Sequence, residues 1–330
     1  MRKIRWGVLS TARIGLQKVL PAMQQGKHGE LIALASRHLE SAKQAAAQLG
    51  IPKVYGSYEE LLNDPEVEAI YNPLPNHLHV PWSIKAIAAG KHVLCEKPIA
   101  TSVSELEQLI DVANAHPQIK VMEAFMYRQH PQWLKARELA QSGKIGEVRT
   151  LHSFISFFSN DAKNVRNKPE MGGGTLFDIG CYSVSIPRFI FGAEPKRVCA
   201  LMEYDPNFGT DRLVSALLDF GSQTATFTCS MQLVRHQSAT IFGTTGKIEM
   251  EIPLNPPLDR PAKIFLQHGS GSEEILIDTC NQFTLQGDAF SLSIINDASV
   301  AVPLADSLAN MKVIEALFES ARKEMWISVQ

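Results

Sequence analysis

The first 125 residues alternate short apolar runs with longer segments in which apolar residues recur every three or four positions. Short runs rich in Val, Ile and Leu are typical of strands buried on both faces, and the longer period is typical of amphipathic helices. We expect strands at residues 4–10, 31–36, 54–55, 69–72, 92–95 and 120–123, with helices between them. Because strands and helices alternate, this region is predicted to form a parallel sheet with helices on both faces.

Local signals mark the ends of several of these helices. Ser57 and Ser102 each precede a glutamate by three residues, which is the spacing of a capping box at a helix start. Gly50 follows the alanine-rich segment 39–49 and suits the left-handed residue that often ends a helix. The predicted helices therefore have defined limits as well as a pattern.

The pattern changes after residue 125. A predicted helix at 131–142 is followed by strand-like segments at 148–158, 213–220, 224–231, 240–242 and 247–252. From Thr224 to Cys229 polar and apolar residues alternate strictly, as expected in an antiparallel sheet with one solvated face. We expect a proline-rich loop at 254–262 and a closing helix at 304–324. The prediction is an α/β chain of two domains: a doubly wound parallel sheet in 1–125, and an α+β domain with a large, mainly antiparallel open sheet in 126–330.

Composition and charge exclude several classes of function. The 330 residues contain 32 Lys and Arg against 34 Asp and Glu, a formal net charge of −2, without a long basic run. We therefore expect neither a nucleic-acid partner nor an anionic membrane surface. No signal-peptide core and no run of about 18 apolar residues is visible, so the expected location is the cytoplasm. The five cysteines are widely spread without a C-x-x-C pair, so neither disulfides nor a metal site is expected.

The turn after the first strand has the position and length of a dinucleotide-binding fingerprint. Residues 10–15 read Ser-Thr-Ala-Arg-Ile-Gly, so Ser10 and Ala12 replace the first two glycines. Because a strand precedes the turn and a helix follows it, backbone N–H groups at the helix start can bind a pyrophosphate. Ser10 and Thr11 add hydroxyl donors. A plain tight turn between strand and helix is the alternative interpretation.

The end of the second strand bears on which dinucleotide would bind. An NAD-specific protein would have Asp or Glu there for the ribose 2′-hydroxyl, whereas this chain has Ser36 and Arg37. A guanidinium can pair bidentately with a 2′-phosphate, which favours NADP over NAD. A solvated arginine at the start of a helix is the alternative.

Two further motifs suggest catalysis. Glu96, Lys97 and Pro98 follow the fifth strand, and ligands bind at the carboxyl ends of strands in an open parallel sheet. Downstream, three glycines at 172–174 come just before a helix in which Asp178 and Tyr182 are four residues apart, and therefore on one face. We expect the glycines to let the backbone approach a ligand closely. The alternatives are a surface lysine, a local capping aspartate and a core tyrosine.

Together these motifs resemble those of the glucose–fructose oxidoreductase/inositol dehydrogenase/rhizopine catabolism (Gfo/Idh/MocA) oxidoreductases over essentially the whole chain. The Glu96-Lys97-Pro98 motif and the glycine-rich stretch with Asp178 are highly specific to that family. Many members have histidine where this chain has Tyr182. The tyrosine form is similar to the branch that contains glucose–fructose oxidoreductase, NADP-dependent D-xylose dehydrogenase and dimeric dihydrodiol dehydrogenase.

The resemblance implies a Rossmann domain and hydride transfer to or from nicotinamide C4, with Tyr182 as the acid/base and Lys97 assisting it. Because a phenol has a pKa of about 10, it needs a nearby cation to act near neutral pH. Asp178 would orient a second substrate hydroxyl, consistent with sugars or vicinal diols. His79, at a helix start, could face the cofactor ribose or only cap the helix. The branch motifs imply cofactor contacts from Ser10, Thr11, Ala12, Arg13, Ile14, Ser36, Arg37, Pro73, Leu74, Asn76, His79, Glu96, Lys97 and Arg166.

Several functions remain open on this evidence. The main hypothesis is an NADP-dependent dehydrogenase of an aldose or cyclic diol, and a sugar-ketone reductase is the alternative direction. A non-catalytic NAD(P)-binding regulatory protein would not need Lys97, Asp178 and Tyr182 together. The resemblance also implies a homodimer formed through the C-terminal sheet, although alternation alone suits a solvated face equally well.

Overall fold

The computed structural model describes residues 2–269 and 271–329. They form two compact units. The first unit extends to Gln129 and includes Asn281–Leu308, and the second consists of His130–Cys280 and the residues from Ala309 onward. The domain limits of 1–125 and 126–330 remain a prediction, and the sequence pattern contains no signal that 281–308 would pack with the first unit.

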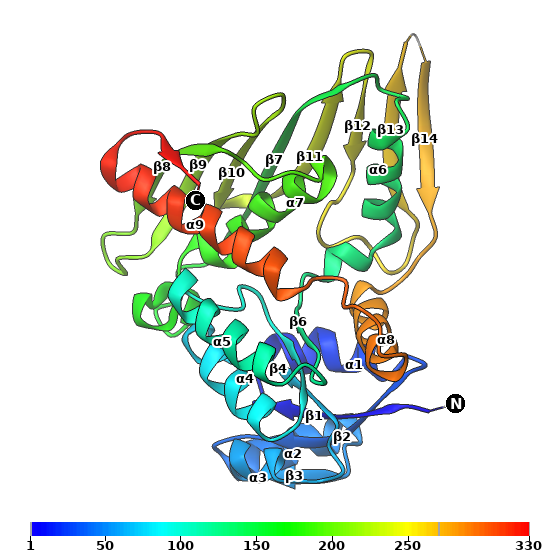
Figure 1. Ribbon diagram of the computed structural model, residues 1–330, viewed down its shortest axis with the longest axis vertical. Coiled ribbons are helices and arrows are strands. Elements are labelled where there is room, and N and C mark those ends of the chain that lie inside the picture. The colour runs from blue at the N-terminus through cyan, green and yellow to red at the C-terminus, as the bar shows by residue number, and fades with distance from the viewer. Residues whose placement is uncertain (1, 270, 330) are drawn as a thin grey trace. The chain divides into compact units, whose positions relative to one another are not determined.

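Within the described part of the chain, the first unit contains a six-stranded parallel sheet in the order β3–β2–β1–β4–β5–β6 (Figure 1). All six predicted strands are confirmed, with ends within two residues of the expected limits. This is the strand order of the Rossmann fold, in which ligands bind where the order reverses beside β1. The strands are β1 (Ile4–Leu9), β2 (Gly29–Ala35), β3 (Lys53–Tyr55), β4 (Ala69–Asn72), β5 (His92–Cys95) and β6 (Val121–Glu123).

The helices of this unit begin and end largely at the predicted signals. The backbone N–H of Glu60 donates to Ser57 Oγ (3.2 Å) and that of Glu105 to Ser102 Oγ (3.1 Å), and Gly50 adopts the left-handed conformation with φ 66°. The first helix begins with a π-helical turn, Gly15–Val19, before α1. The α-helices are α1 (Leu20–Met23), α2 (Leu39–Leu49), α3 (Tyr58–Leu62), α4 (His79–Ala88), α5 (Val103–Ala115) and α8 (Gln282–Ile295).

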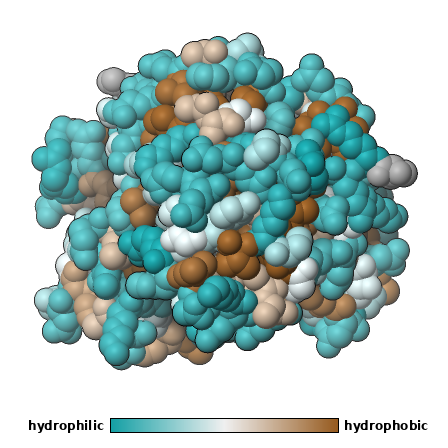
Figure 2. All heavy atoms as spheres, turned by 90° about the horizontal axis from the view of Figure 1, so that it is seen from below, coloured by the Kyte–Doolittle hydropathy of each residue, from teal (hydrophilic) through white to brown (hydrophobic). Residues whose placement is uncertain are grey.

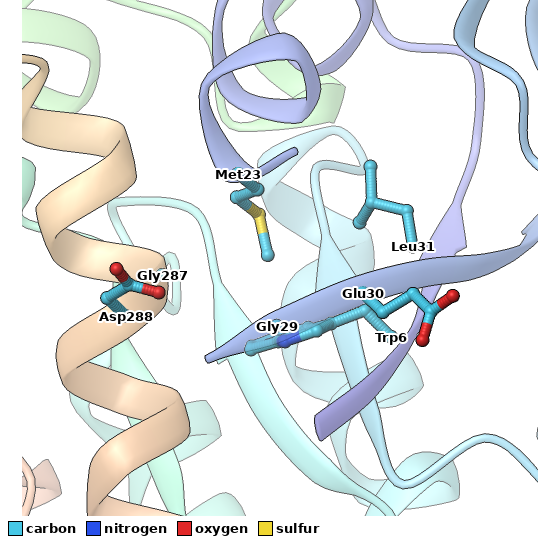
Figure 3. Close-up of a pocket in the computed structure, with 7 residues that line it drawn as sticks. All are labelled: Trp6, Met23, Gly29, Glu30, Leu31, Gly287 and Asp288. Atoms are coloured by element: carbon cyan, nitrogen blue, oxygen red, sulfur yellow. The ribbon is translucent and has the colours of Figure 1, made fainter. Parts of the chain in front are cut away.

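Helix α8 was not predicted, and it completes the core of the first unit. The indole N–H of Trp6 donates to Ser291 Oγ (3.2 Å), and the Trp6 and Phe290 rings lie 5.7 Å apart. At Gly287 an added Cβ would lie 3.0 Å from Met23 Cγ, so the absence of a side chain lets the helices approach closely. Figure 3 shows this seam, where the crevice lined by Trp6 and Met23 is too narrow for a water molecule. Glycine inside a helix lowers helix propensity, which weakened the sequence signal.

Among the described residues, the second unit contains a nine-stranded sheet in the order β14–β13–β12–β11–β7–β10–β9–β8–β15. Neighbours are antiparallel except β7 and β10, which are parallel, so the predicted mainly antiparallel sheet is confirmed. The strands are β7 (Val148–Phe158), β8 (Arg197–Tyr204), β9 (Asp211–Asp219), β10 (Thr224–Ser230), β11 (Gln232–Gly243), β12 (Gly246–Met250), β13 (Ala262–His268), β14 (Gly271–Ile277) and β15 (Ile327–Ser328).

Some strands of this sheet differ from the prediction. The predicted strand at 240–242 is only the end of the longer β11, and β8, β13, β14 and β15 were not predicted. Strand β14 lies at the sheet edge and is exposed along most of its length, so it lacks a hydrophobic alternation. Edge strands of this kind give a weak signal because burial is what produces the alternation.

Helices cover one face of the second sheet (Figure 1). These are α6 (Pro131–Gln141), α7 (Cys181–Phe191) and the part of α9 (Leu304–Lys323) that belongs to this unit. In β10 the side chains of Ala225, Phe227 and Cys229 are buried, whereas the intervening threonines are more exposed, which confirms the predicted alternation. Within the described residues, the opposite face of the sheet at β10 is therefore the more exposed one, and we refer to it as the open face.

No helix in the described ranges is long and apolar enough to span a membrane. Polar residues cover most of the face shown in Figure 2, with apolar residues interspersed. Two apolar residues of the second sheet are largely exposed, Leu201 of β8 at 75% and Val234 of β11 at 82%.

Candidate active site

The turn after β1 has the geometry of a dinucleotide-binding turn without its first glycine. Ser10 adopts φ 81°, a left-handed conformation that glycine usually provides. Its Oγ accepts the backbone N–H of Ala12 (3.0 Å), and its own N–H donates to the Ala35 carbonyl (2.8 Å). The serine hydroxyl therefore stabilises the turn from within. Ser10, Thr11 and Ala12 are only half-buried, and the helix starts directly after them.

The ends of β1, β4 and β5 lie side by side, which gathers several predicted residues. A Cβ added at Gly15 would lie 3.5 Å from Tyr71 and 3.8 Å from Pro73, so the first helix packs closely against the end of β4. The Tyr71 hydroxyl donates to Glu96 Oε1 (2.6 Å). Glu96 thus contacts the switch point of the sheet, and this tyrosine partner was not predicted.

At the end of β2, Ser36 is buried and Arg37 is exposed. Ser36 Oγ accepts the backbone N–H of His38 (3.3 Å), which shapes the turn that presents Arg37. The pKa of Tyr58 is raised because burial outweighs the charge and hydrogen bond of Arg37. The guanidinium therefore lies beside the Tyr58 phenol, at the position where an acidic residue would mark NAD.

His79 lies in the interior of the first unit, with 1% of its surface exposed. Its Nδ1 is 2.7 Å from the Pro98 carbonyl oxygen and its Nε2 is 2.6 Å from that of Leu74. Burial lowers the pKa of His79 to about 4, against the effect of both carbonyls, so at pH 7 the neutral ring donates to one of them. These contacts favour the structural alternative, in which His79 holds the two loops together. A cofactor contact from His79 remains only a prediction.

Lys97 follows the end of β5, which stops at Cys95. It is half-buried, and its peptide bond to Pro98 is cis. Because His79 contacts the Pro98 carbonyl, the backbone next to Lys97 is connected to the loop at Leu74. Asn76 lies in a short 3₁₀ helix after that loop, so Pro73, Leu74, Asn76 and Lys97 all lie near the carboxyl ends of β4 and β5.

The second unit brings together Arg166, Asp178 and Tyr182. Asp178 lies in a π-helical turn, Leu176–Gly180, that continues into α7, and Tyr182 follows at the start of α7 with 6% of its surface exposed. The Arg166 Nε donates to Asp178 Oδ2 (2.7 Å). This ion pair, which was not predicted, orients the Asp178 carboxylate and places a positive charge beside it.

The glycine run before this helix has an internal explanation. A Cβ at Gly173 would lie 2.5 Å from the Arg166 carbonyl oxygen, and one at Gly174 would lie 2.0 Å from Asp211 Oδ1. Gly174 also adopts φ 119°, which L-residues rarely do. The predicted reason for the glycines was close approach of a ligand, whereas the atoms beside Gly173 and Gly174 belong to the protein itself.

The residues of the first unit fit a bound dinucleotide. The half-buried turn at Ser10 ends in a helix N-terminus, whose first N–H groups have no intrahelical acceptor. The residues at positions 36 and 37 are Ser and Arg, so no carboxylate at the end of β2 would repel a 2′-phosphate.

All five cysteines are described and none forms a disulfide. The described residues contain no group of three His, Cys, Asp or Glu placed to hold a metal ion.

Two family models match the chain. Residues 4–125 match an oxidoreductase family with an NAD-binding Rossmann fold, and residues 133–249 match the GFO/IDH/MocA C-terminal domain. Together the two matches include the turn at Ser10, Lys97, Asp178 and Tyr182. The motifs that suggested the family therefore lie within the matched regions.

Named relatives agree with these models. D-xylose 1-dehydrogenase (NADP(+)) 2 of Haloferax volcanii is 36% identical over 320 residues, covering 96% of this chain and 97% of that protein. Trans-1,2-dihydrobenzene-1,2-diol dehydrogenase of Mus musculus is 33% identical over 252 residues, covering 75% and 74%. The crystal structure of a 3-ketoreductase from Actinomadura kijaniata, in complex with NADP and TDP-benzene, superposes with a TM-score of 0.91 at 29% identity, covering 96% of this chain and 98% of that one. The chain therefore belongs to the Gfo/Idh/MocA family of oxidoreductases, whose Rossmann domain binds NAD(P).

Proposed function

We propose that this protein is an NADP-dependent oxidoreductase that transfers a hydride between the nicotinamide and a carbon bearing a hydroxyl group in a sugar or cyclic diol. The observation that supports it most is the pairing of a carboxylate and a phenol, Asp178 and Tyr182, about one turn apart at the start of one helix, with Arg166 bound to the carboxylate. Relatives named as a D-xylose 1-dehydrogenase, a trans-1,2-dihydrobenzene-1,2-diol dehydrogenase and a 3-ketoreductase support this substrate class.

The proposed preference for NADP rests on Arg37. It is exposed at the end of β2, beside Tyr58, in the place where NAD-specific proteins carry an acid. A guanidinium there adds charge-assisted hydrogen bonds to a 2′-phosphate. The Haloferax relative is named as an NADP-dependent enzyme and the Actinomadura structure contains NADP, which supports the same preference.

The proposed roles follow from residue chemistry. A bound nicotinamide accepts or supplies the hydride. Tyr182 exchanges the proton of the reacting hydroxyl, and the ammonium of Lys97 stabilises the phenolate form of Tyr182 that takes this proton. Asp178, held by Arg166, accepts a hydrogen bond from a neighbouring substrate hydroxyl and so orients the substrate. A regulatory protein without catalysis would not require these three groups.

The direct test is a substrate panel with both cofactors. Purified protein is mixed with NADP or with NAD and with pentoses, hexoses and trans-diols, and absorbance of the reduced cofactor is followed. We expect turnover with at least one sugar or diol and a higher kcat/KM for NADP than for NAD. Equal or better use of NAD would overturn the Arg37 assignment, and no turnover in either direction would overturn the function.

The reverse direction is a second candidate because the Actinomadura structure is that of a ketoreductase. Here Tyr182 would donate the proton to the forming hydroxyl. Oxidation of NADPH by a panel of keto sugars, run beside the first panel, decides between the directions. A kcat/KM at least tenfold higher for reduction would identify the protein as a reductase.

The proposal also includes a cytoplasmic homodimer formed through the open face of the second sheet. Support comes from a shallow groove on that face, lined by His152, Leu201, Leu217 and Thr226, and from the 75% exposure of Leu201. Large exposed apolar surfaces often mark protein interfaces. Light scattering should give twice the mass of 36.5 kDa, and Leu201→Asp should give the monomer mass.

A further inference from the structure

A buried carboxyl group, Asp211, lies at the start of the helix that bears Asp178 and Tyr182. Asp211 is the first residue of β9 and is 2% exposed. Its Oδ2 accepts the backbone N–H of Leu176 (2.7 Å), and the backbone of Thr175 and of Asp211 itself also donates to it. A carboxyl group at a helix N-terminus satisfies N–H groups that the helix cannot bond internally.

This carboxyl comes from a different strand, not from the residue before the helix. In α3 and α5 the cap is a serine directly before the first turn. Here residue 175 is threonine, whose Oγ1 instead accepts the backbone N–H of Met231 (3.1 Å). The Asp211 carboxyl group and the Thr175 hydroxyl therefore both connect the helix start to the sheet. Asp211 does so from β9, and Thr175 through Met231, the residue after β10.

The absence of a side chain at Gly174 leaves room for the carboxyl group of Asp211. The Gly174 carbonyl accepts the N–H of Asp178 (3.0 Å), and the Gly174 N–H donates to the Arg166 carbonyl (2.9 Å). Because a Cβ at this position would lie 2.0 Å from Asp211 Oδ1, any side chain would displace the carboxyl group. Asp211, Gly174 and the first helical turn thus form one packed unit, with Asp178 in that turn.

We infer that Asp211 is a positioning residue for the reaction: its carboxyl group fixes the start of the helix and thereby the placement of Asp178 and Tyr182. The inference rests on the proposed function, since those two residues act on substrate there. Asp211 itself, being buried within the second unit, does not contact substrate. A displacement of about 1 Å in a reacting group can lower a rate by about 100-fold, so loss of this contact should be visible in kcat.

The experiment compares Asp211→Ala with Asp211→Asn, which keeps one acceptor oxygen of the same reach. Asp288→Ala is the matched control, because Asp288 also accepts backbone N–H groups, from Lys27 and His28 at 2.9–3.0 Å. These two residues precede β2, whereas Lys97 follows the opposite, carboxyl end of β5 in the same parallel sheet. Each variant is measured for kcat and KM, for the Kd of NADPH by fluorescence, for Tm, and for hydrogen exchange in peptides that span 174–182.

We expect Asp211→Ala to lower kcat by about 10- to 100-fold with the NADPH Kd within twofold of wild type, and to speed exchange at the helix start. Asp211→Asn should recover kcat to within about threefold, and Asp288→Ala should lower Tm without changing kcat. If Asp211→Ala does not fold, Asp211→Ser replaces it in the same comparison. Wild-type kcat together with wild-type exchange in folded Asp211→Ala, or in Asp211→Ser where the alanine variant does not fold, would overturn the inference.

The exchange measurement separates this inference from the proposed function. If wild-type protein turns over no sugar or diol, the proposed function fails, and faster exchange in Asp211→Ala still supports the role of Asp211 in placing the helix start. If wild-type protein is active and the exchange of residues 175–178 is unaffected, the positioning inference alone fails.

Discussion

Two turns in this protein lead into helices that both begin with a π-helical turn, and they use their backbone N–H groups differently. After β1, Ser10 takes the left-handed conformation, and the helix start beyond it is half-exposed. Before α7, glycine at 174 is required, and the carboxyl group of Asp211 accepts N–H groups of the helix start. The first arrangement leaves donors for an anionic ligand, and the second uses them internally and presents side chains one turn later. The glycine content of a turn therefore does not by itself show whether the turn binds a ligand.

The largest difference between the turns should appear when their glycines are replaced. Gly174→Ala should destabilise the second unit by about 3 kcal/mol or more, because Cβ would overlap Asp211 and φ 119° is unfavourable for alanine. Gly15→Ala should change stability by about 1 kcal/mol or less, because its Cβ meets Tyr71 at an ordinary 3.5 Å. Urea unfolding followed by fluorescence measures both. Equal losses of unfolding free energy in Gly174→Ala and Gly15→Ala would contradict the steric distinction between the two turns.

The turns at the carboxyl ends of β1 and β2 should respond to the phosphates of the cofactor. Arg37→Ala removes the proposed partner of the 2′-phosphate, and we expect the KM for NADP to rise by about 10- to 100-fold, as the loss of a charge-assisted contact implies. The KM for NAD should stay within about twofold. Lys43→Ala is the control for a general loss of positive charge, because Lys43 is an exposed residue of α2 that pairs with Glu40. A parallel rise for both cofactors in Arg37→Ala would contradict the assignment.

The turn before α7 should respond to pH through Asp211. Burial raises the pKa of Asp211 to about 7, so between about pH 4 and 7 the folded protein holds a proton that the unfolded chain has released. Its contribution to stability is therefore full below about pH 4 and is lost as the pH rises to 7. The stability difference between wild type and Asp211→Asn should fall by about 1.4 kcal/mol per pH unit in this window. A difference independent of pH would contradict the raised pKa.

Two buried histidines give the stability of the protein an opposite pH dependence, which cancels when wild type is compared with Asp211→Asn. Burial lowers the pKa of His79 and of His130 to about 4, so both stay neutral in the fold while the unfolded chain protonates below about pH 6.5. Their contribution falls as the pH drops from 6.5 to 4, and it is the same in both proteins. Tyr204 and Cys229, whose pKa values the charge of Asp211 helps to raise, remain protonated throughout this range.

The smallest effect concerns the hydroxyl that stabilises the first turn. Ser10→Ala removes the acceptor of the Ala12 N–H and should cost about 1 kcal/mol. Ser10→Gly loses the same bond but relieves the left-handed backbone, so we expect stability within about 0.5 kcal/mol of wild type. Thermal unfolding in the absence of cofactor compares the two variants. A glycine variant less stable than the alanine variant would show that the backbone conformation is not the dominant cost.

The sequence allowed prediction of every strand of the first unit because most of those strands are largely buried and are bounded by clear turns. Strand β3, whose three residues are half-buried, has the weakest pattern. It did not reveal α8, whose pattern is interrupted by Gly287, or β14, whose side chains are largely exposed at a sheet edge. Lys97, Asp178 and Tyr182 could be selected because they lie in recognisable motifs. Asp211 and Tyr71 could not, since each is a single residue on a strand whose contact with the site depends on the fold.

The central claim is that Tyr182 exchanges the substrate proton in an NADP-linked hydride transfer. The most direct test measures kcat and the NADPH Kd for Tyr182→Phe and Tyr182→His with the sugar or diol found in the panel. We expect the phenylalanine variant to bind NADPH normally and to lose about 10²- to 10⁴-fold in kcat, the usual contribution of general acid–base catalysis. The histidine variant, with a group that can also exchange a proton, should retain more activity than the phenylalanine variant. Wild-type turnover by Tyr182→Phe would contradict the claim.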